Sequence, residues 1–273
     1  MSISFPQALP VVRNLELTFN QGKTYLLTGP SASGKSTLLR FLKGLIPLFY
    51  PATITGILEI NGKQVTIEEF WDYRTEIGYL FQDPSLQVIG SNVAKDIAFG
   101  LENLAIPESI IKQKISEIGN NLNISQLLSR STTELSGGEL ALVALASILV
   151  LQPQILLLDE FTAYLDNDAR KSVLSTIKQL QSPNRIIIVV SHHITEFLPL
   201  IDEIIVLDGG NVILQKPAAD FISLHLKTIE EKIRIPEFFS LGVNLCENKS
   251  ISPHFQTVAD LMKLLTVNNY DNP

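Results

Sequence analysis

The chain has 273 residues, of which 45% are hydrophobic and 18% are charged. This composition excludes an intrinsically disordered chain, and the length suits one or two packed domains. The net charge of −7 argues against a general nucleic-acid binder, because phosphate backbones are held by clustered lysine and arginine side chains.

Three further features bear on the cellular setting. Cys246 is the single cysteine, so an intrachain disulfide is excluded and a reducing compartment is consistent with the sequence. The N-terminus lacks a basic segment followed by an apolar stretch, so we expect no signal peptide. The longest apolar run, residues 140–151, is shorter than the roughly twenty residues that span a bilayer. It predicts a buried helix, and other chains would supply any membrane-spanning segments.

The early sequence predicts short strands of an N-terminal antiparallel β part. Residues 14–19 and 57–60 have the alternating or apolar pattern of strands. Asn61-Gly62 follows the second run, and this dipeptide suits a tight hairpin because both positions accept positive φ.

Four further apolar runs predict strands that are buried on both faces of a mostly parallel sheet. Helical patterns separate them, and strands that alternate with helices indicate an α/β domain. The predicted strands span residues 25–28, 155–158, 186–190 and 204–207, and the helices span 36–46 and 168–181.

Residues 83–150 lack strand patterns and predict a helical subdomain inserted into the α/β core. Its candidate helices span 92–104, 107–121 and 138–151. The core with its insertion then covers residues 1–215, and residues 216–273 form a C-terminal helical extension. That extension has a helix over 218–233 and a frayed end.

A phosphate-binding loop is predicted between the strand 25–28 and the helix 36–46. The pattern is G-x-x-x-x-G-K-[ST], in which backbone amides and a helix N-terminus surround a phosphate. Lys35 adds a full positive charge, and Ser36 is the expected Mg²⁺ ligand. A glycine-rich turn that merely carries a lysine is the structural alternative. The predicted nucleotide-binding residues are Gly29, Pro30, Ser31, Ala32, Ser33, Gly34, Lys35, Ser36 and Thr37.

Two acids, Asp159 and Glu160, end the predicted strand 155–158. Burying a carboxylate is costly unless a metal or a donor compensates it. We expect Asp159 to hold Mg²⁺ through water, and Glu160 to orient or deprotonate a water that attacks the γ-phosphate. The alternative is an acidic loop that faces solvent.

The segment Leu135-Ser-Gly-Gly-Glu139 resembles the signature of the ABC ATPases, usually LSGGQ. Taken alone, it is a plain helix start with Ser136 as N-cap. Further residues match that family in order. Gln82 resembles the Q-loop glutamine that senses Mg²⁺ and the attacking water, Asp166 resembles the D-loop aspartate, and His192 resembles the switch histidine that contacts the γ-phosphate.

The resemblance covers about residues 1–215 and implies the ABC ATPase fold, a P-loop NTPase core that binds ATP and Mg²⁺. It also implies a pair of cassettes, formed with a second ABC ATPase subunit that is the same chain or a different one. Each ATP would lie between the phosphate loop of one subunit and Ser136, Gly137 and Gly138 of the other.

Residues 78–87, 96–104 and 234–239 are similar to the cobalt-importer and energy-coupling-factor branch. That similarity implies an ATPase at the cytoplasmic face of the cell membrane, which powers uptake of a vitamin or metal ion. Its partners would be a transmembrane coupling protein and a substrate-binding membrane subunit, with no nucleic acid. The alternative is a soluble ABC ATPase that acts on nucleic acid or ribosomes.

The sequence departs from the family pattern in three places. Only Met1 to Ser4 precede Phe5, our candidate for the aromatic residue that stacks on adenine; a disordered terminus is the alternative. Phe161 replaces a common proline. Leu140 to Leu142 are apolar where polar residues are usual, so we expect a partner chain or the C-terminal region to cover this helix.

Overall fold

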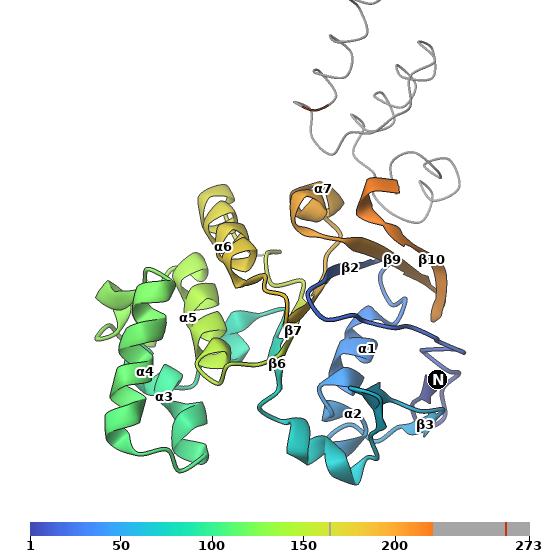
Figure 1. Cartoon of the computed structure of the whole chain (residues 1–273), viewed down its shortest axis with the longest axis horizontal. Helices are drawn as coiled ribbons and strands as arrows, with labels where there is room; N and C mark the ends of the chain where they lie inside the picture. Colours follow the sequence, from blue (N-terminus) through green and yellow to red (C-terminus); the bar gives the residue numbers. More distant parts are fainter. Residues whose placement is uncertain (164, 221–259, 261–273) are drawn as a thin grey trace, which may run out of the picture.

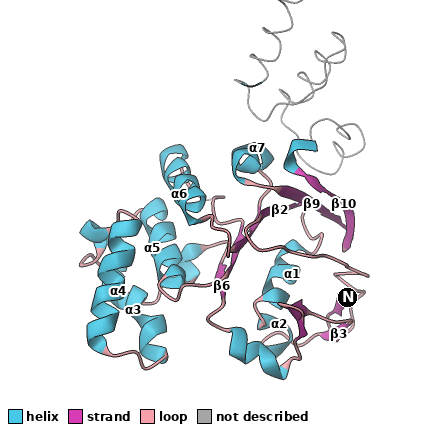
Figure 2. Cartoon of the chain, in the orientation of Figure 1, coloured by secondary structure: helices cyan, strands magenta, loops and turns pink. Residues whose placement is uncertain are grey.

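The computed structural model describes residues 1–163, 165–220 and 260. In this part of the chain, the central sheet has six strands in the order β10-β9-β2-β8-β7-β6 (Figures 1 and 2). All of them run parallel except β10, which pairs antiparallel with β9 at one edge. The strands are β2 (Thr24–Thr28), β6 (Ile77–Leu80), β7 (Ile155–Asp159), β8 (Ile186–Val190), β9 (Glu203–Asp208) and β10 (Asn211–Pro217).

Helices cover both faces of this sheet (Figure 1). Successive strand residues point to opposite faces, so each strand contributes to two apolar clusters in alternation. In β7, Leu156 and Leu158 join one cluster with α3 to α7, whereas Leu157 joins the other with α1 and α2. The helices are α1 (Lys35–Leu42), α2 (Leu45–Leu48), α3 (Val93–Asn103), α4 (Glu108–Asn121), α5 (Gly137–Leu149), α6 (Asn167–Leu180) and α7 (Ile194–Phe197).

Short 3-10 helices connect several of these elements. They span Glu68–Tyr73, Pro84–Leu86, Ser125–Leu127, Thr132–Glu134 and Leu198–Leu200. The turn at Pro84–Leu86 directly follows the Gln82 position, and the turn at Thr132–Glu134 leads into α5. These two short turns therefore flank predicted functional segments, one after Gln82 and the other before Ser136.

The N-terminal part is antiparallel, as predicted. β1 (Ser2–Ser4) pairs with β3 (Thr53–Thr55), and β4 (Glu59–Ile60) pairs with β5 (Lys63–Gln64). The second pair is the hairpin expected at Asn61-Gly62, where φ is 52° and 74°.

The strand predicted over residues 14–19 is wrong. This segment forms no ladder within the described residues, although Leu15 is buried and Leu17 and Phe19 pack on the core. Its alternating apolar side chains therefore report burial alone. The run over 57–60 is also shorter than predicted, since only Glu59–Ile60 pairs.

The strands and helices of the α/β core are confirmed, with ends shifted by a few residues. The largest shift is at α1, which ends at Leu42 instead of residue 46, because the chain turns at Gly44 with a φ of 80°. The three helices predicted within 83–150 are present as α3, α4 and α5 and lie together beside the sheet (Figure 1). The domain limits themselves remain an interpretation. The predicted helix over 218–233 and the frayed end lie almost entirely outside the described residues.

Most of helix α5 is buried by the described part of its own chain, and the cover expected over Leu140 to Leu142 from a partner chain or the C-terminal region stays a prediction. Side chains from α3, α4, α6 and the sheet surround it, and Ala141, Val143 and Leu145 are fully buried. Leu140 and Leu142 are half-buried at its start. Its uniformly apolar sequence thus reflects a helix at the centre of a layer. None of the described helices combines the length and apolar character needed to cross a bilayer.

We predict that Leu145→Ala lowers the free energy of unfolding by about 2–5 kcal/mol, because it leaves a cavity in a closely packed layer. Leu142→Ala, on the half-buried side of the same helix, is the matched control and should cost clearly less. Denaturant unfolding of the purified chain measures both values. Equal, small effects would contradict the burial of α5.

Candidate functional site

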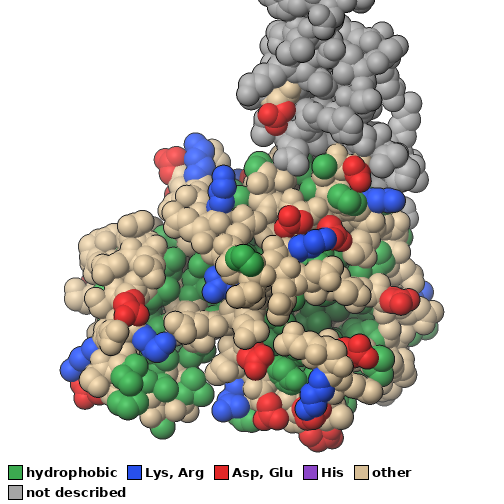
Figure 3. Space-filling view, viewed as in Figure 1, with side chains coloured by type: hydrophobic (Ala, Val, Ile, Leu, Met, Phe, Trp, Pro, Cys, Tyr) green, Lys and Arg blue, Asp and Glu red, His purple; other side chains and the backbone are tan. Residues whose placement is uncertain are grey.

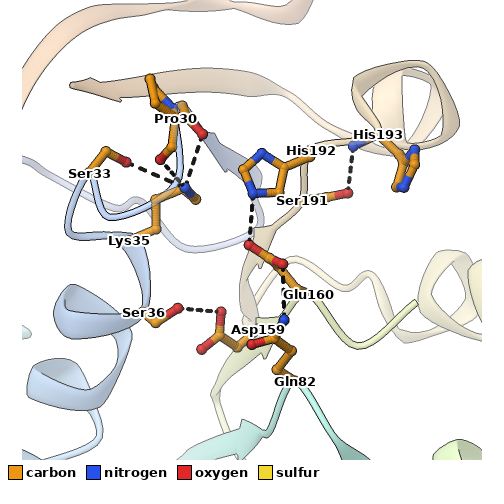
Figure 4. A network of polar contacts seen from close by, with 11 residues as sticks. Pro30, Ser33, Lys35, Ser36, Gln82, Asp159, Glu160, Ser191, His192 and His193 are labelled. Atoms are coloured by element: carbon orange, nitrogen blue, oxygen red, sulfur yellow. Dashed lines mark hydrogen bonds and ion pairs between the residues drawn. The ribbon is translucent and has the colours of Figure 1, made fainter. Parts of the chain in front are cut away.

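Many of the predicted site residues meet at the carboxyl edge of the parallel strands (Figure 4). The phosphate loop follows β2, and Gln82 follows β6. Asp159 and Glu160 end β7, and His192 follows β8. Ligands of open α/β sheets bind outside this edge, so the topology alone brings distant parts of the sequence together.

The phosphate loop packs tightly against the neighbouring strand. A Cβ atom on Gly29, which has a φ of 140°, would lie 1.9 Å from the Leu207 carbonyl oxygen, so only glycine fits here. Ala32 has a φ of 61°, a left-handed conformation that is often retained at functional sites. Ser33 is buried, and Ser31 is exposed at the tip of the loop. The loop therefore has a fixed shape and leads directly into α1.

Lys35 lies inside this loop and is only 4% exposed. Its Nζ donates to the carbonyl oxygens of Gly29 (3.0 Å) and Pro30 (2.8 Å) and to Ser33 Oγ (3.4 Å) (Figure 4). Burial lowers the pKa of Lys35, while Glu160 and Asp159 act in the opposite direction. All these hydrogen-bond partners are uncharged. The Lys35 ammonium can therefore bind an anion at the mouth of the loop.

Asp159 is buried and accepts two hydrogen bonds. Ser36 Oγ donates to its Oδ1 (2.9 Å), and the Tyr79 hydroxyl donates to its Oδ2 (2.8 Å). Burial raises the pKa of Asp159, and both donors lower it. A serine hydroxyl beside a carboxylate is an oxygen donor set that fits Mg²⁺. The described residues contain no cluster of three metal-binding side chains, so phosphate and water oxygens would have to complete the coordination.

Glu160 is held between two side chains (Figure 4). Gln82 Nε2 donates to its Oε2 (3.2 Å), and His192 Nε2 lies 3.0 Å from its Oε1. Its backbone amide donates to the Val190 carbonyl of the next strand, at a φ of 45°. The carboxylate is thus oriented from β6 and β8 together, as expected for a group that must hold one position.

The pKa of His192 is lowered, first by burial and then by the Lys35 charge, whereas Glu160 raises it. The neutral imidazole is therefore favoured at neutral pH. Next to it, the Ser191 hydroxyl accepts from the His193 amide at 2.9 Å and fixes the turn after β8. The geometry brings His192, Gln82 and Glu160 into one group.

Ser136, Gly137 and Gly138 begin α5. Ser136 caps the helix by accepting from the Glu139 amide, and Glu139 accepts from the Ser136 amide in return. Arg130 lies 3.0 Å from Glu139 and also donates to the Glu134 carbonyl. Ser136 and Gly137 are exposed, and no hydrogen bond or ion pair between described residues joins them to the phosphate loop. Within one chain, these two segments remain separate.

Asp166 caps α6 by accepting from the amides of Asp168 and Ala169. It is exposed and lies near the start of α5, because Gly138 approaches Ala169 so closely that an added Cβ would come within 2.4 Å of the Ala169 Cβ. Thr37 is half-buried in the first turn of α1. Phe5 is half-buried after β1 and packs on the core, and its adenine-stacking role remains a prediction.

Sequence reasoning missed Tyr79 and Arg130. The signal for Tyr79 was a hydroxyl in an otherwise apolar buried strand, since such a group needs a partner. Arg130 had no comparable signal, because its contact with Glu139 depends on the fold of the intervening turn.

We predict that His192 titrates below the ordinary histidine pKa of 6.5. Glu160→Gln should lower its midpoint further, and Lys35→Met should raise it, because the two charges act in opposite directions. NMR titration of the histidine ring protons, assigned with His192→Gln, measures all three midpoints. A wild-type midpoint at or above 6.5, or shifts in the reverse directions, would contradict this geometry.

Comparison with known proteins gives the family. A model of the ABC transporter family matches residues 12–163. The energy-coupling factor transporter ATP-binding protein EcfA1 of Latilactobacillus sakei is 35% identical over 86% of this chain and 83% of the relative. A Lactobacillus johnsonii protein, named as an ABC transporter ATP-binding protein, is 36% identical over 90% of this chain. The chain spans only 44% of that relative.

Among solved structures, CbiO1 of Clostridium perfringens, described as part of the ABC transporter complex CbiONQ, has a TM-score of 0.75. It is 25% identical, and the match covers 88% of this chain and 95% of CbiO1. The chain therefore belongs to the ABC transporter family, as an ATP-binding ATPase subunit similar to those of energy-coupling-factor transporters.

Proposed function

We propose that this chain hydrolyses ATP to power an importer of a micronutrient, a vitamin or a metal ion, through a separate transmembrane partner. The observation that carries the proposal is the convergence of Lys35, Asp159 and the Glu160 group on one sheet edge within hydrogen-bonding range of their neighbours. An anion site, a divalent-cation site and an oriented carboxylate are the three parts that phosphoryl transfer to water requires.

In this proposal, the loop Gly29–Gly34 and Lys35 bind the phosphates of ATP, and Ser36 and Asp159 hold Mg²⁺. Thr37 belongs to the first turn behind them. Bound Mg²⁺ would neutralise charge on the phosphate oxygens. Phe5 supports the adenine from the N-terminal part of the chain.

Glu160 acts as the general base toward the attacking water. Gln82 and His192 orient it, and both reach it from neighbouring strands. A largely neutral His192 can donate through one ring nitrogen and accept through the other. Once Glu160 has taken up a proton from water, its carboxyl group can donate to one ring nitrogen, and the N–H on the other nitrogen can donate to a γ-phosphate oxygen. General-base assistance of this kind contributes typically about 10²–10⁴ in rate.

The exposed start of α5 supports a paired assembly. Ser136, Gly137 and Gly138 present a helix N-terminus to solvent, with Asp166 close by. In the proposed pair, this surface of one subunit covers the ATP on the phosphate loop of the other, and Asp166 lies at the seam. One chain then carries both halves of a site without closing one alone.

A groove beside the Gln82 loop suits a helix of the membrane partner. It has a volume of about 300 Å³ and lies between the sheet and α3, with Phe81, Ile89 and Phe99 among its lining residues. Ile89 is 64% exposed and Phe99 is 46% exposed. Exposed apolar side chains around a groove favour docking of an apolar helix face. Docking here would place the chain at the cytoplasmic face of the membrane.

The relatives support the importer assignment, since EcfA1 is named for an energy-coupling-factor transporter and CbiO1 is described as part of the ABC transporter complex CbiONQ. The alternative, a soluble ABC ATPase acting on nucleic acid or ribosomes, finds less support. On the face in Figure 3, acidic and basic side chains are interspersed and form no continuous basic stripe. The net charge of −7 points in the same direction.

For the hydrolysis step, we predict that Glu160→Gln retains ATP binding and lowers turnover at least about 100-fold, because the general base is lost. Glu16→Gln, at an exposed position outside the site, is the matched control. Phosphate release and nucleotide binding are measured on the same samples of the assembled transporter. Wild-type turnover in Glu160→Gln would exclude the general-base role.

For the partner, we predict that Ile89→Asp reduces co-purification of the membrane subunits at least about tenfold, because central apolar contacts contribute about 2 kcal/mol or more. Ile110→Asp replaces an exposed isoleucine on α4, outside the groove lining, and serves as the control. Both variants should bind ATP like the wild type. Equal recovery of the membrane subunits with both would place the docking surface elsewhere.

A further inference from the structure

Tyr79 and Asp159 lie on adjacent parallel strands and point to the same face of the sheet. The register pairs Tyr79 of β6 with Leu157 of β7, so Asp159 is two residues further along the partner strand. Residues two apart in a strand share a face. A tyrosine is long enough to reach this diagonal position, and its hydroxyl lies 2.8 Å from Asp159 Oδ2.

Both side chains are removed from solvent, with Tyr79 5% exposed and Asp159 1% exposed. A buried carboxylate oxygen loses its water and depends on donors from the protein. Tyr79 supplies the donor to Oδ2, and Ser36 supplies the donor to Oδ1 at 2.9 Å. The two oxygens therefore have different surroundings, one toward β6 and the other toward α1.

This difference has a consequence for a divalent cation. A cation held by Ser36 and Asp159 replaces the hydrogen bond between them, while the bond from Tyr79 to Oδ2 is on the opposite side of the carboxylate and can persist. Groups that hydrogen-bond to a metal-binding side chain orient it, and their loss typically lowers metal affinity about 10–100-fold.

We propose that Tyr79 is a positioning residue for Mg²⁺, because its hydroxyl fixes Asp159 with Oδ1 directed toward Ser36. This inference rests on the proposed function, since it takes Ser36 and Asp159 as the side chains that hold the metal. Tyr79 acts through Asp159. The groups that surround the Lys35 ammonium are Gly29, Pro30 and Ser33, so phosphate binding without metal does not depend on Tyr79.

The test is Tyr79→Phe, which keeps the ring and removes only the hydroxyl. ATP binding is titrated by calorimetry in EDTA and at increasing Mg²⁺. We expect the affinity for ATP in EDTA to be the same as in the wild type. The Mg²⁺ concentration that gives half of the maximal change in ATP affinity should rise about tenfold or more. In an Asp159→Asn background, the same substitution should add little further change, because the group that it positions is gone.

Tyr25→Phe is the matched control. Tyr25 is a buried tyrosine of β2 in the same apolar cluster, and its hydroxyl accepts from the Asn20 amide at 2.7 Å. It should keep the wild-type dependence on Mg²⁺. Thermal unfolding without ligand, recorded for both variants, shows any general loss of structure.

Two failures can be told apart. If Mg²⁺ changes ATP binding by the wild type and Asp159→Asn removes that change, the result supports the proposed metal site. In that case, a Mg²⁺ dependence in Tyr79→Phe equal to that of the wild type overturns only the role of Tyr79. Equal losses in EDTA and in Mg²⁺ would also overturn it, because they indicate a general structural effect. If the wild type shows no Mg²⁺ effect, the proposed metal site falls, and this inference falls with it.

Discussion

The arrangement of the site depends on two buried groups of opposite charge, Lys35 and Asp159, at one edge of the sheet. Burial disfavours the charged form of Lys35 and of Asp159, lowering the pKa of the first and raising that of the second. Each is stabilised by neutral hydrogen-bonding groups instead of a direct ion pair with the other. A phosphate group and a divalent cation are the complementary charges for such a site. The strands and the phosphate loop have to be rigid because a small shift would leave these groups without their partners.

Helix α5 connects the two surfaces that would respond to the nucleotide. Its N-terminus carries Ser136, and near its other end the Ser147 hydroxyl donates to Asp96 Oδ2 at 2.6 Å. Asp96 Oδ1 accepts from the amides of Ile89 and Gly90 at the groove. A thirteen-residue helix is about 20 Å long, so one stiff element joins the groove to the exposed Ser136 and Gly137.

Local patterns predicted much of this fold. The phosphate loop, the buried strands and the acids at the end of β7 are each encoded within a few neighbouring residues, and the strand order then brings them together. The strand prediction for residues 14–19 was wrong because alternating apolar and polar residues indicate burial of one face and do not show whether a pairing strand is present. The elements that bury most of α5 were missed for a related reason, since the apolar sequence shows that a helix is buried without showing by what.

Long-range contacts escaped prediction altogether. The hydrogen bond between Tyr79 and Asp159 joins residues 80 positions apart and depends on the register of two strands. The contact between Arg130 and Glu139 depends on a 3-10 turn. Neither register nor turn geometry is encoded by a short motif.

Binding of Mg-ATP to wild type and Lys35→Ala, with Lys178→Ala at an exposed position of α6 as control, tests the central claim most directly. The measured quantity is the rise in melting temperature on adding Mg-ATP. The account predicts a clear rise for the wild type and for Lys178→Ala, and none for Lys35→Ala. An equal rise in all three proteins would contradict it.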